Sequence, residues 1–80
     1  MKHELKTINP YYNDIDMGTK TFEVRKNDRN FKVGDLMILR EYLQQGIYSG
    51  KSITCIITYV LDNPEYCKEE YAVLGFKKLQ

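Results

Sequence analysis

The stretch GTKTFEVR, residues 18–25, decides the fold because it joins a turn residue to an alternation of polar and apolar side chains. Successive side chains of a strand point to opposite faces. The alternation therefore predicts a strand with its two apolar side chains on one face and its charged side chains on the other. Glu23 and Arg25 then share a face, close to Lys20 at the start of the strand. A lysine, a glutamate and an arginine are predicted to lie close together.

The sequence before this stretch predicts a first strand and a short helix. Residues 3–8 alternate enough to form the strand. Asn9 is placed to cap a helix of about two turns, which Gly18 ends. Tyr12 and Ile15 are spaced to form the apolar stripe of that helix.

The sequence after this stretch is dominated by strand-forming residues. The predicted elements are a strand over residues 21–26, a polar turn over 27–30, strands over 36–42 and 52–60 joined by a loop, a polar segment with one helical turn over 62–70, and a strand over 71–78. About five strands with one or two short helices, one of them between strands 1 and 2, predict a mainly β fold. A small, partly closed β-barrel is favoured over an open layer because closure removes exposed strand edges.

Length and composition predict one small globular domain over residues 1–80. The 80 residues are 42% hydrophobic and 29% charged, which is ordinary for a folded domain with a small core. The longest apolar run, residues 36–39, is far shorter than the roughly 20 residues that cross a bilayer. The first six residues carry charges where a secretory signal needs an apolar run. We therefore expect a cytoplasmic protein without a membrane partner.

The cysteine and histidine content predicts neither a metal site nor a cofactor. Cys55 and Cys67 follow no pairing or ligand spacing, and the chain has a single histidine. In a reducing compartment both cysteines are expected to be free thiols. The net charge is +1, but cations gather between residues 18 and 40, so this third of the chain is predicted to carry the positive face.

The spacing Gly-x-Lys-x-x-Glu-x-Arg over residues 18–25 resembles the signature of the ASCH domains, a branch of the PUA-like superfamily of barrels. The flanking stretches HELK (3–6), RKNDRNF (25–31) and VGD (33–35) resemble the small family DUF3850, which occurs in bacteria and their phages. The resemblance runs nearly from end to end. It implies a PUA-like pseudo-barrel with a helix beside its mouth, a cleft lined by the signature residues, and binding of RNA or a modified nucleoside.

The candidate ligand-binding residues form a cationic cleft around this signature. They are Lys20, Glu23, Arg25, Arg29, Asn27, Asp28, His3 and Lys6. Arg25 offers a planar fork to a phosphate or a base edge, and Glu23 can accept a hydrogen bond from an exocyclic amine. Arg29 would contact a phosphate, while His3 and Lys6 would face the same opening from the first strand. For Asn27 and Asp28, an ordinary turn is an equally good interpretation.

Three functions remain open from the sequence. The first is a non-catalytic module that binds single-stranded RNA, a nucleotide or a modified nucleoside. The second is an amidohydrolase that deacetylates nucleosides such as N4-acetylcytidine, with Lys20 and Glu23 as catalytic residues; similar ASCH enzymes have a threonine where this chain has Glu23. The third is an accessory protein, bacterial or from a phage, that docks on a protein partner. If the signature residues have no function, Glu23 and Arg25 would form an exposed ion pair on the surface of the strand. Such a pair would stabilise the fold by about 0 to 1 kcal/mol.

Overall fold

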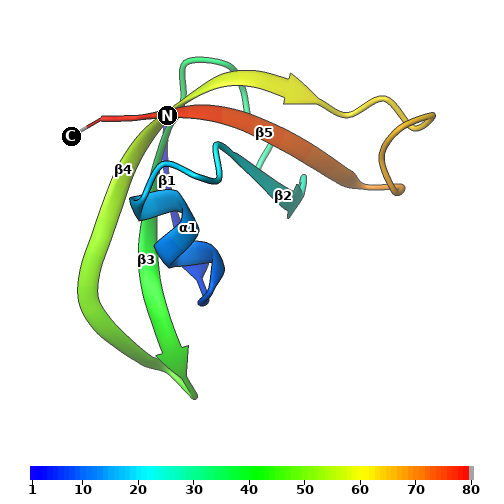
Figure 1. The fold of residues 1–80 in the computed structure, drawn as a ribbon. Coiled ribbons are helices and arrows are strands. Elements are labelled where there is room, and N and C mark those ends of the chain that lie inside the picture. Colours follow the sequence, from blue (N-terminus) through cyan, green and yellow to red (C-terminus); the bar gives the residue numbers. More distant parts are fainter. Residues whose placement is uncertain (80) are drawn as a thin grey trace.

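The computed structural model describes residues 1–79 and consists of one curled sheet that surrounds a short helix (Figure 1). Its elements are β1 (Lys2–Thr7), α1 (Tyr11–Asp16), β2 (Phe22–Lys26), β3 (Leu36–Gln44), β4 (Ile47–Leu61) and β5 (Tyr71–Lys78). The strand order across the sheet is β1-β3-β4-β5-β2, so β1 and β2 form its two edges. The sheet curls into a half-barrel, and the predicted mainly β fold with a helix between the first two strands is confirmed.

The strand pairing explains how the sheet curls. β1 pairs with β3 in parallel, and the other neighbours are antiparallel. β4 pairs with β3 through its first part and with β5 through its last part, so this long strand runs around the bend (Figure 1). Register shifts occur in both of its pairings, and such bulges increase the local bend and twist of a strand.

The core lies on the concave face of the sheet, where α1 packs against the strands. Tyr12 and Ile15 are only 3% and 1% exposed, which confirms the predicted apolar stripe of the helix. They join a cluster with buried side chains of the strands, among them Leu39 and Leu74. Full burial of one such aliphatic side chain stabilises the fold by about 1.5–3 kcal/mol. The N-cap of α1 is Pro10, which makes no side-chain cap hydrogen bond, so the prediction that Asn9 caps the helix is wrong by one residue. The amide oxygen of Asn9 instead accepts a hydrogen bond from the backbone N–H of Asn13.

Two connections differ from the sequence prediction. The loop predicted over residues 43–51 is mostly strand, because β3 and β4 continue as an exposed arm whose turn is formed by Gln45 and Gly46. The polar residues there lie on exposed faces, so their composition resembles that of a loop. The helical turn predicted within residues 62–70 is a series of turns, in which the Asn63 carbonyl accepts from two backbone N–H groups.

The faces of β2 alternate as predicted, but its charged face is the one turned inward. Glu23 is 4% exposed, whereas Phe22 and Val24 are 44% and 55% exposed. The reason is the pairing with β5, which sets Glu23 opposite the fully buried Leu74. Directly paired residues share a face of the sheet. The interpretation of Glu23 and Arg25 as an exposed surface pair is therefore wrong.

Two further findings concern the whole described chain. Cys55 and Cys67 are both free, as predicted. Among the described residues, no helix has the length and apolar character needed to span a membrane.

Candidate functional site

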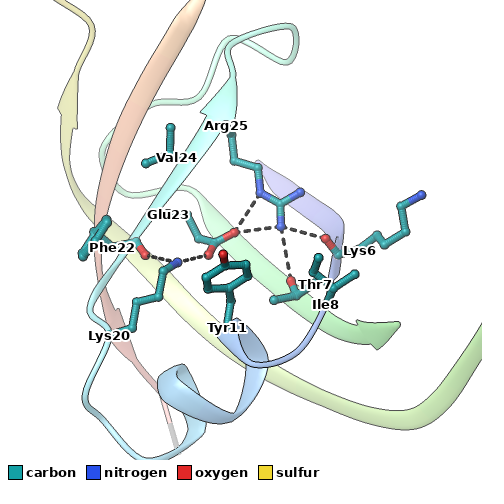
Figure 2. A pocket seen from close by; sticks show the side chains of 9 residues that line it. All are labelled: Lys6, Thr7, Ile8, Tyr11, Lys20, Phe22, Glu23, Val24 and Arg25. Atoms are coloured by element: carbon teal, nitrogen blue, oxygen red, sulfur yellow. Dashed lines mark hydrogen bonds and ion pairs between the residues drawn. The ribbon is translucent and has the colours of Figure 1, made fainter. Parts of the chain in front are cut away.

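A cleft of about 550 Å³ lies between the end of β1, the start of α1 and the edge strand β2 (Figure 2). The residues that line it are Lys6, Thr7, Ile8, Tyr11, Lys20, Phe22, Glu23, Val24 and Arg25. Its volume is within the range typical of pockets for small molecules. The sequence-predicted residues Lys20, Glu23, Arg25 and Lys6 are thus brought to one place.

A buried carboxylate with two cationic partners forms the polar centre of the cleft. The Lys20 ammonium lies 2.5 Å from Oε1 of Glu23, and Nε of Arg25 donates to Oε2 at 2.8 Å. Figure 2 shows the two cations reaching the carboxylate from opposite sides. The side chains of Lys20, Glu23 and Arg25 are 17%, 6% and 23% exposed, so the cluster is largely shielded from water. Two cations and one carboxylate give the centre a net positive charge.

The turn after α1 positions Lys20. Gly18 has a φ of 82°, a left-handed conformation that glycine adopts without strain, and it ends the helix. The backbone N–H groups of Thr19 and Lys20 then donate to the carbonyl of Asp14, which turns the chain toward β2. The Lys20 ammonium also donates to the Phe22 carbonyl at 2.7 Å. Its long side chain is thereby held over the cleft.

The edge strand β1 positions Arg25. Nη2 of its guanidinium donates to the Lys6 carbonyl at 2.8 Å and to the Thr7 hydroxyl at 3.2 Å. Together with the bond from Nε to Glu23, these contacts fix the plane of the guanidinium. Nη1 has no hydrogen-bond acceptor among residues 1–79, so both of its N–H groups remain free to bind a ligand.

Four exposed apolar side chains surround this polar centre. They are Ile8, Tyr11, Phe22 and Val24, each between 44% and 55% exposed. The rings of Tyr11 and Phe22 lie 5.6 and 5.0 Å from the Lys20 ammonium, so both flank the same cation. The cleft therefore combines flat apolar surfaces with fixed hydrogen-bonding groups.

Sequence reasoning missed these apolar residues, although one signal pointed to Tyr11. Because Tyr12 and Ile15 face the core, the neighbouring Tyr11 must lie on another side of α1. Thr7 and Ile8 gave no signal, since their place in the cleft depends on how β1 lies opposite β2.

Other predicted site residues lie elsewhere in the structure. Arg29 is outside the cleft lining and donates to the Glu4 carbonyl at 2.8 Å. Asn27 and Asp28 line a separate hollow of about 410 Å³. The amide oxygen of Asn27 accepts from the backbone N–H of Phe31, which supports the alternative interpretation of this segment as a turn.

His3 does not face the cleft, contrary to the expectation that it shares an opening with Lys6. Residues 3 and 6 are separated by an odd number of positions, so alternation along β1 places them on opposite faces. The His3 ring is 4% exposed, its Nε2 lies 2.8 Å from Oδ2 of Asp35, and it packs on Phe31. His3 is therefore a buried structural residue and does not line the cleft.

The surroundings of Cys55 make its thiol unsuitable as a nucleophile. Burial raises the pKa of the Cys55 thiol to about 11, and the negative charge of Glu23 adds to the effect. The thiol is therefore protonated at neutral pH and a poor nucleophile. Among the described residues, no group of three or more His, Cys, Asp or Glu side chains could hold a metal ion.

Fold and site together define a small mainly β domain with a cationic cleft at the open edge of a half-barrel. The chain belongs to the family described as "Domain of unknown function (DUF3850)", whose sequence model matches residues 2–76. This match includes every residue of the cleft. It confirms the resemblance to DUF3850 seen in the flanking sequence.

A phage protein is similar to most of the chain. It is the "Uncharacterized 12.9 kDa protein in GpA 3'region" of Escherichia phage P2, which is 38% identical over 72 residues. The similarity covers 90% of this chain but 64% of the phage protein, so the chain spans less than two thirds of that relative. Neither description states an activity.

Proposed function

We propose that this chain is a non-catalytic binding module of the ASCH/PUA-like type, and that its cleft holds a nucleotide of single-stranded RNA or a nucleoside. One observation carries the proposal: the buried Glu23 carboxylate is fixed between the Lys20 ammonium and the Arg25 guanidinium, in a cleft whose rim is formed by apolar side chains. The ASCH-like spacing of these three residues supports it, because the same residues meet in the structure.

A contribution to the stability of the fold is a weak explanation for burying the charges of Lys20, Glu23 and Arg25 together. Removing charges from water costs several kcal/mol per ion, and apolar residues of similar volume often stabilise a fold equally well or better. The cluster also lies at the open edge of the sheet, beside side chains that remain half exposed. A small number of fixed polar groups within a largely apolar pocket is typical of a ligand-binding site.

The groups of the cleft match those that recognise an unpaired nucleotide. The rings of Tyr11 and Phe22 can stack on a base, an interaction worth about 1–3 kcal/mol per base. The free Nη1 donors of Arg25 suit a phosphate or a base carbonyl, and the remaining lone pairs of Glu23 can accept from an exocyclic amine. Single-stranded RNA is recognised by this combination of stacking and hydrogen bonds to base edges.

The geometry favours binding over hydrolysis. A general base needs a free lone pair on nitrogen, whereas Nζ of Lys20 is the donor in short contacts with Glu23 and with the Phe22 carbonyl. As the donor in both contacts, Lys20 is placed to hold Glu23 rather than to receive a proton. If the chain is an amidohydrolase instead, it should release acetate from N4-acetylcytidine, and Lys20→Ala should abolish that release.

The decisive experiment measures binding of a labelled, mixed-sequence single-stranded RNA by fluorescence anisotropy. We expect binding that weakens between about 50 and 200 mM salt, because phosphate contacts release counterions. Arg25→Lys retains the charge but loses the planar fork, so it should weaken binding. The matched control is Lys77→Ala, which removes an exposed cation from β5 outside the cleft.

Two results would reject the proposal. The first is the absence of salt-dependent RNA binding by the wild-type chain. The second is equal binding by wild type and Arg25→Lys. A protein partner captured through Tyr11 and Phe22, without RNA, would support the docking alternative.

A further inference from the structure

A second group of aromatic and cationic side chains lies on the outer face of β1, β3 and β4. We name it the outer platform; its members are Lys6, Arg40, Tyr42 and Tyr48. The Lys6 ammonium lies 4.6 Å from the centre of the Tyr42 ring, and the Arg40 guanidinium lies 4.1 Å from that of Tyr48. The two rings meet edge to face, with centres 5.2 Å apart. Four side chains from three strands thus form one continuous surface.

The pairing of the strands produces this surface. Lys6 is paired with Arg40 across β1 and β3, and Tyr42 is paired with Tyr48 across β3 and β4. Leu39 is buried in the core, so the adjacent Arg40 must point to the outer face. The side chains of the outer platform therefore point away from the core, and that of Arg40 is 44% exposed.

Lys6 connects the outer platform to the cleft. Its carbonyl accepts the hydrogen bond from Arg25 inside the cleft, while its ammonium lies over Tyr42 on the outer platform. Figure 2 shows its side chain directed away from the Glu23 carboxylate. The outer platform thus begins at a residue that also lines the cleft.

The charge of the outer platform suits a polyanion with flat groups. It contains two cations, one of which, Arg40, lies 3.8 Å from the carboxylate of Glu4, a side chain that is 59% exposed. Bases stack on tyrosine rings and on the planes of arginine side chains, while lysine and arginine neutralise the phosphates between them. The outer platform supplies all of these groups within reach of one another.

We infer that the outer platform holds the nucleotide next to the one in the cleft, so that the ligand is a single strand rather than a free nucleoside. This inference rests on the proposed function, because the first nucleotide occupies the cleft. It assigns Tyr48 to base stacking and Arg40 to a phosphate contact. Lys6 lies where the RNA strand would pass from the cleft to the outer platform.

The experiment compares two probes, cytidine monophosphate and a mixed-sequence RNA octamer, by titration calorimetry. The octamer should bind at least about tenfold more tightly, because a stacked base adds to the affinity. Tyr48→Ala and Arg40→Gln should each weaken octamer binding about five- to tenfold and leave monophosphate binding unchanged. Arg40→Gln should also reduce the slope of log affinity against log salt by about 0.7. Arg25→Lys should weaken binding of both probes.

The matched control is Tyr59→Ala, which removes an exposed tyrosine of β4 outside the outer platform. Thermal unfolding of each variant checks that it folds. Equal affinity for the two probes, or octamer binding unaffected by Tyr48→Ala and Arg40→Gln, overturns the inference and leaves the proposed function standing. Octamer binding that depends on Tyr48 but not on Arg25 also overturns it, since one strand then does not span both sites. Failure of the wild-type chain to bind either probe rejects the inference together with the proposed function.

Discussion

Arg29 donates a hydrogen bond from Nη1 to the Glu4 carbonyl at 2.8 Å, across the open edge of the half-barrel. Arg25 makes the same kind of contact with the Lys6 carbonyl, also at 2.8 Å. Alternate residues of a strand direct their carbonyls to the same edge, so both acceptors belong to the unpaired edge of β1. Two arginine side chains thus occupy acceptors that a neighbouring strand would use in a closed barrel.

We expect Arg29→Ala to loosen β1 without affecting the cleft. The lost hydrogen bond should lower the free energy of unfolding by about 1 kcal/mol, as is typical of a single hydrogen bond. Urea unfolding measures this change, and amide hydrogen exchange should show less protection in β1. Lys26→Ala is the control, because its ion pair with Glu70 is exposed and should contribute little. Equal effects of the two substitutions would show that the contact with Glu4 has no special role.

Acid should destabilise the protein through Asp35. The hydrogen bond from His3 lowers the pKa of this carboxyl group, assisted by the backbone N–H of Lys32 and the amino group of Met1. The folded-state pKa then lies below the unfolded value of about 3.9. The stabilisation is complete above about pH 4 and is lost as the pH falls through the folded-state pKa.

Urea unfolding at a series of pH values between neutrality and about pH 2.5 tests this dependence. Asp35→Asn should lower the stability at neutral pH and flatten the acid limb of the curve. Part of the slope should remain, because hydrogen bonds from Ser49 and Asn9 lower the pKa of Glu41 in the same direction. An acid limb unchanged by Asp35→Asn would contradict the assignment.

The cluster in the cleft should show strong coupling between Glu23 and Lys20. Glu23→Gln leaves two cations beside a neutral amide, and we expect a loss of about 2 kcal/mol, less than the 3–5 kcal/mol of a fully buried pair. Lys20→Met alone should also destabilise the fold, since Glu23 loses a partner. The double variant should be more stable than the sum of the single losses predicts, by at least about 1 kcal/mol. Additive losses would mean that the two side chains act independently.

The sequence correctly predicted those elements whose buried side chains recur at the regular spacing of a helix or a strand. The stripe of α1, the β3–β4 hairpin and the bounds of β5 all follow from local patterns of apolar residues. The exposed arm of β3 and β4 was predicted as a loop, because neither of its faces is covered by a core. The parallel pairing of β1 with β3 depends on contacts far apart in the chain, which no local pattern encodes.

The site was predictable to the extent that it lies on one short stretch. Lys20, Glu23 and Arg25 meet because the turn after α1 and the strand spacing place them together. The inward orientation of Glu23 is set by its pairing with β5, which depends on tertiary structure. Arg29 and His3 have the residue types of a binding site but are used to close the sheet and to fill the core.

The two cysteines should differ in reactivity because their surroundings differ. Cys55 is fully buried, and burial raises the pKa of its thiol to about 11, so the reactive thiolate is rare at pH 8. Cys67 lies in the polar connection before β5 and is partly exposed. Iodoacetamide should therefore modify Cys67 first, and Cys55 only after urea unfolds the sheet, as mass spectrometry of the digested chain can show. With Cys67→Ser, the native protein should take up almost no label. Rapid labelling of that variant under native conditions would instead show that the sheet opens around Cys55 far more often than its packing implies.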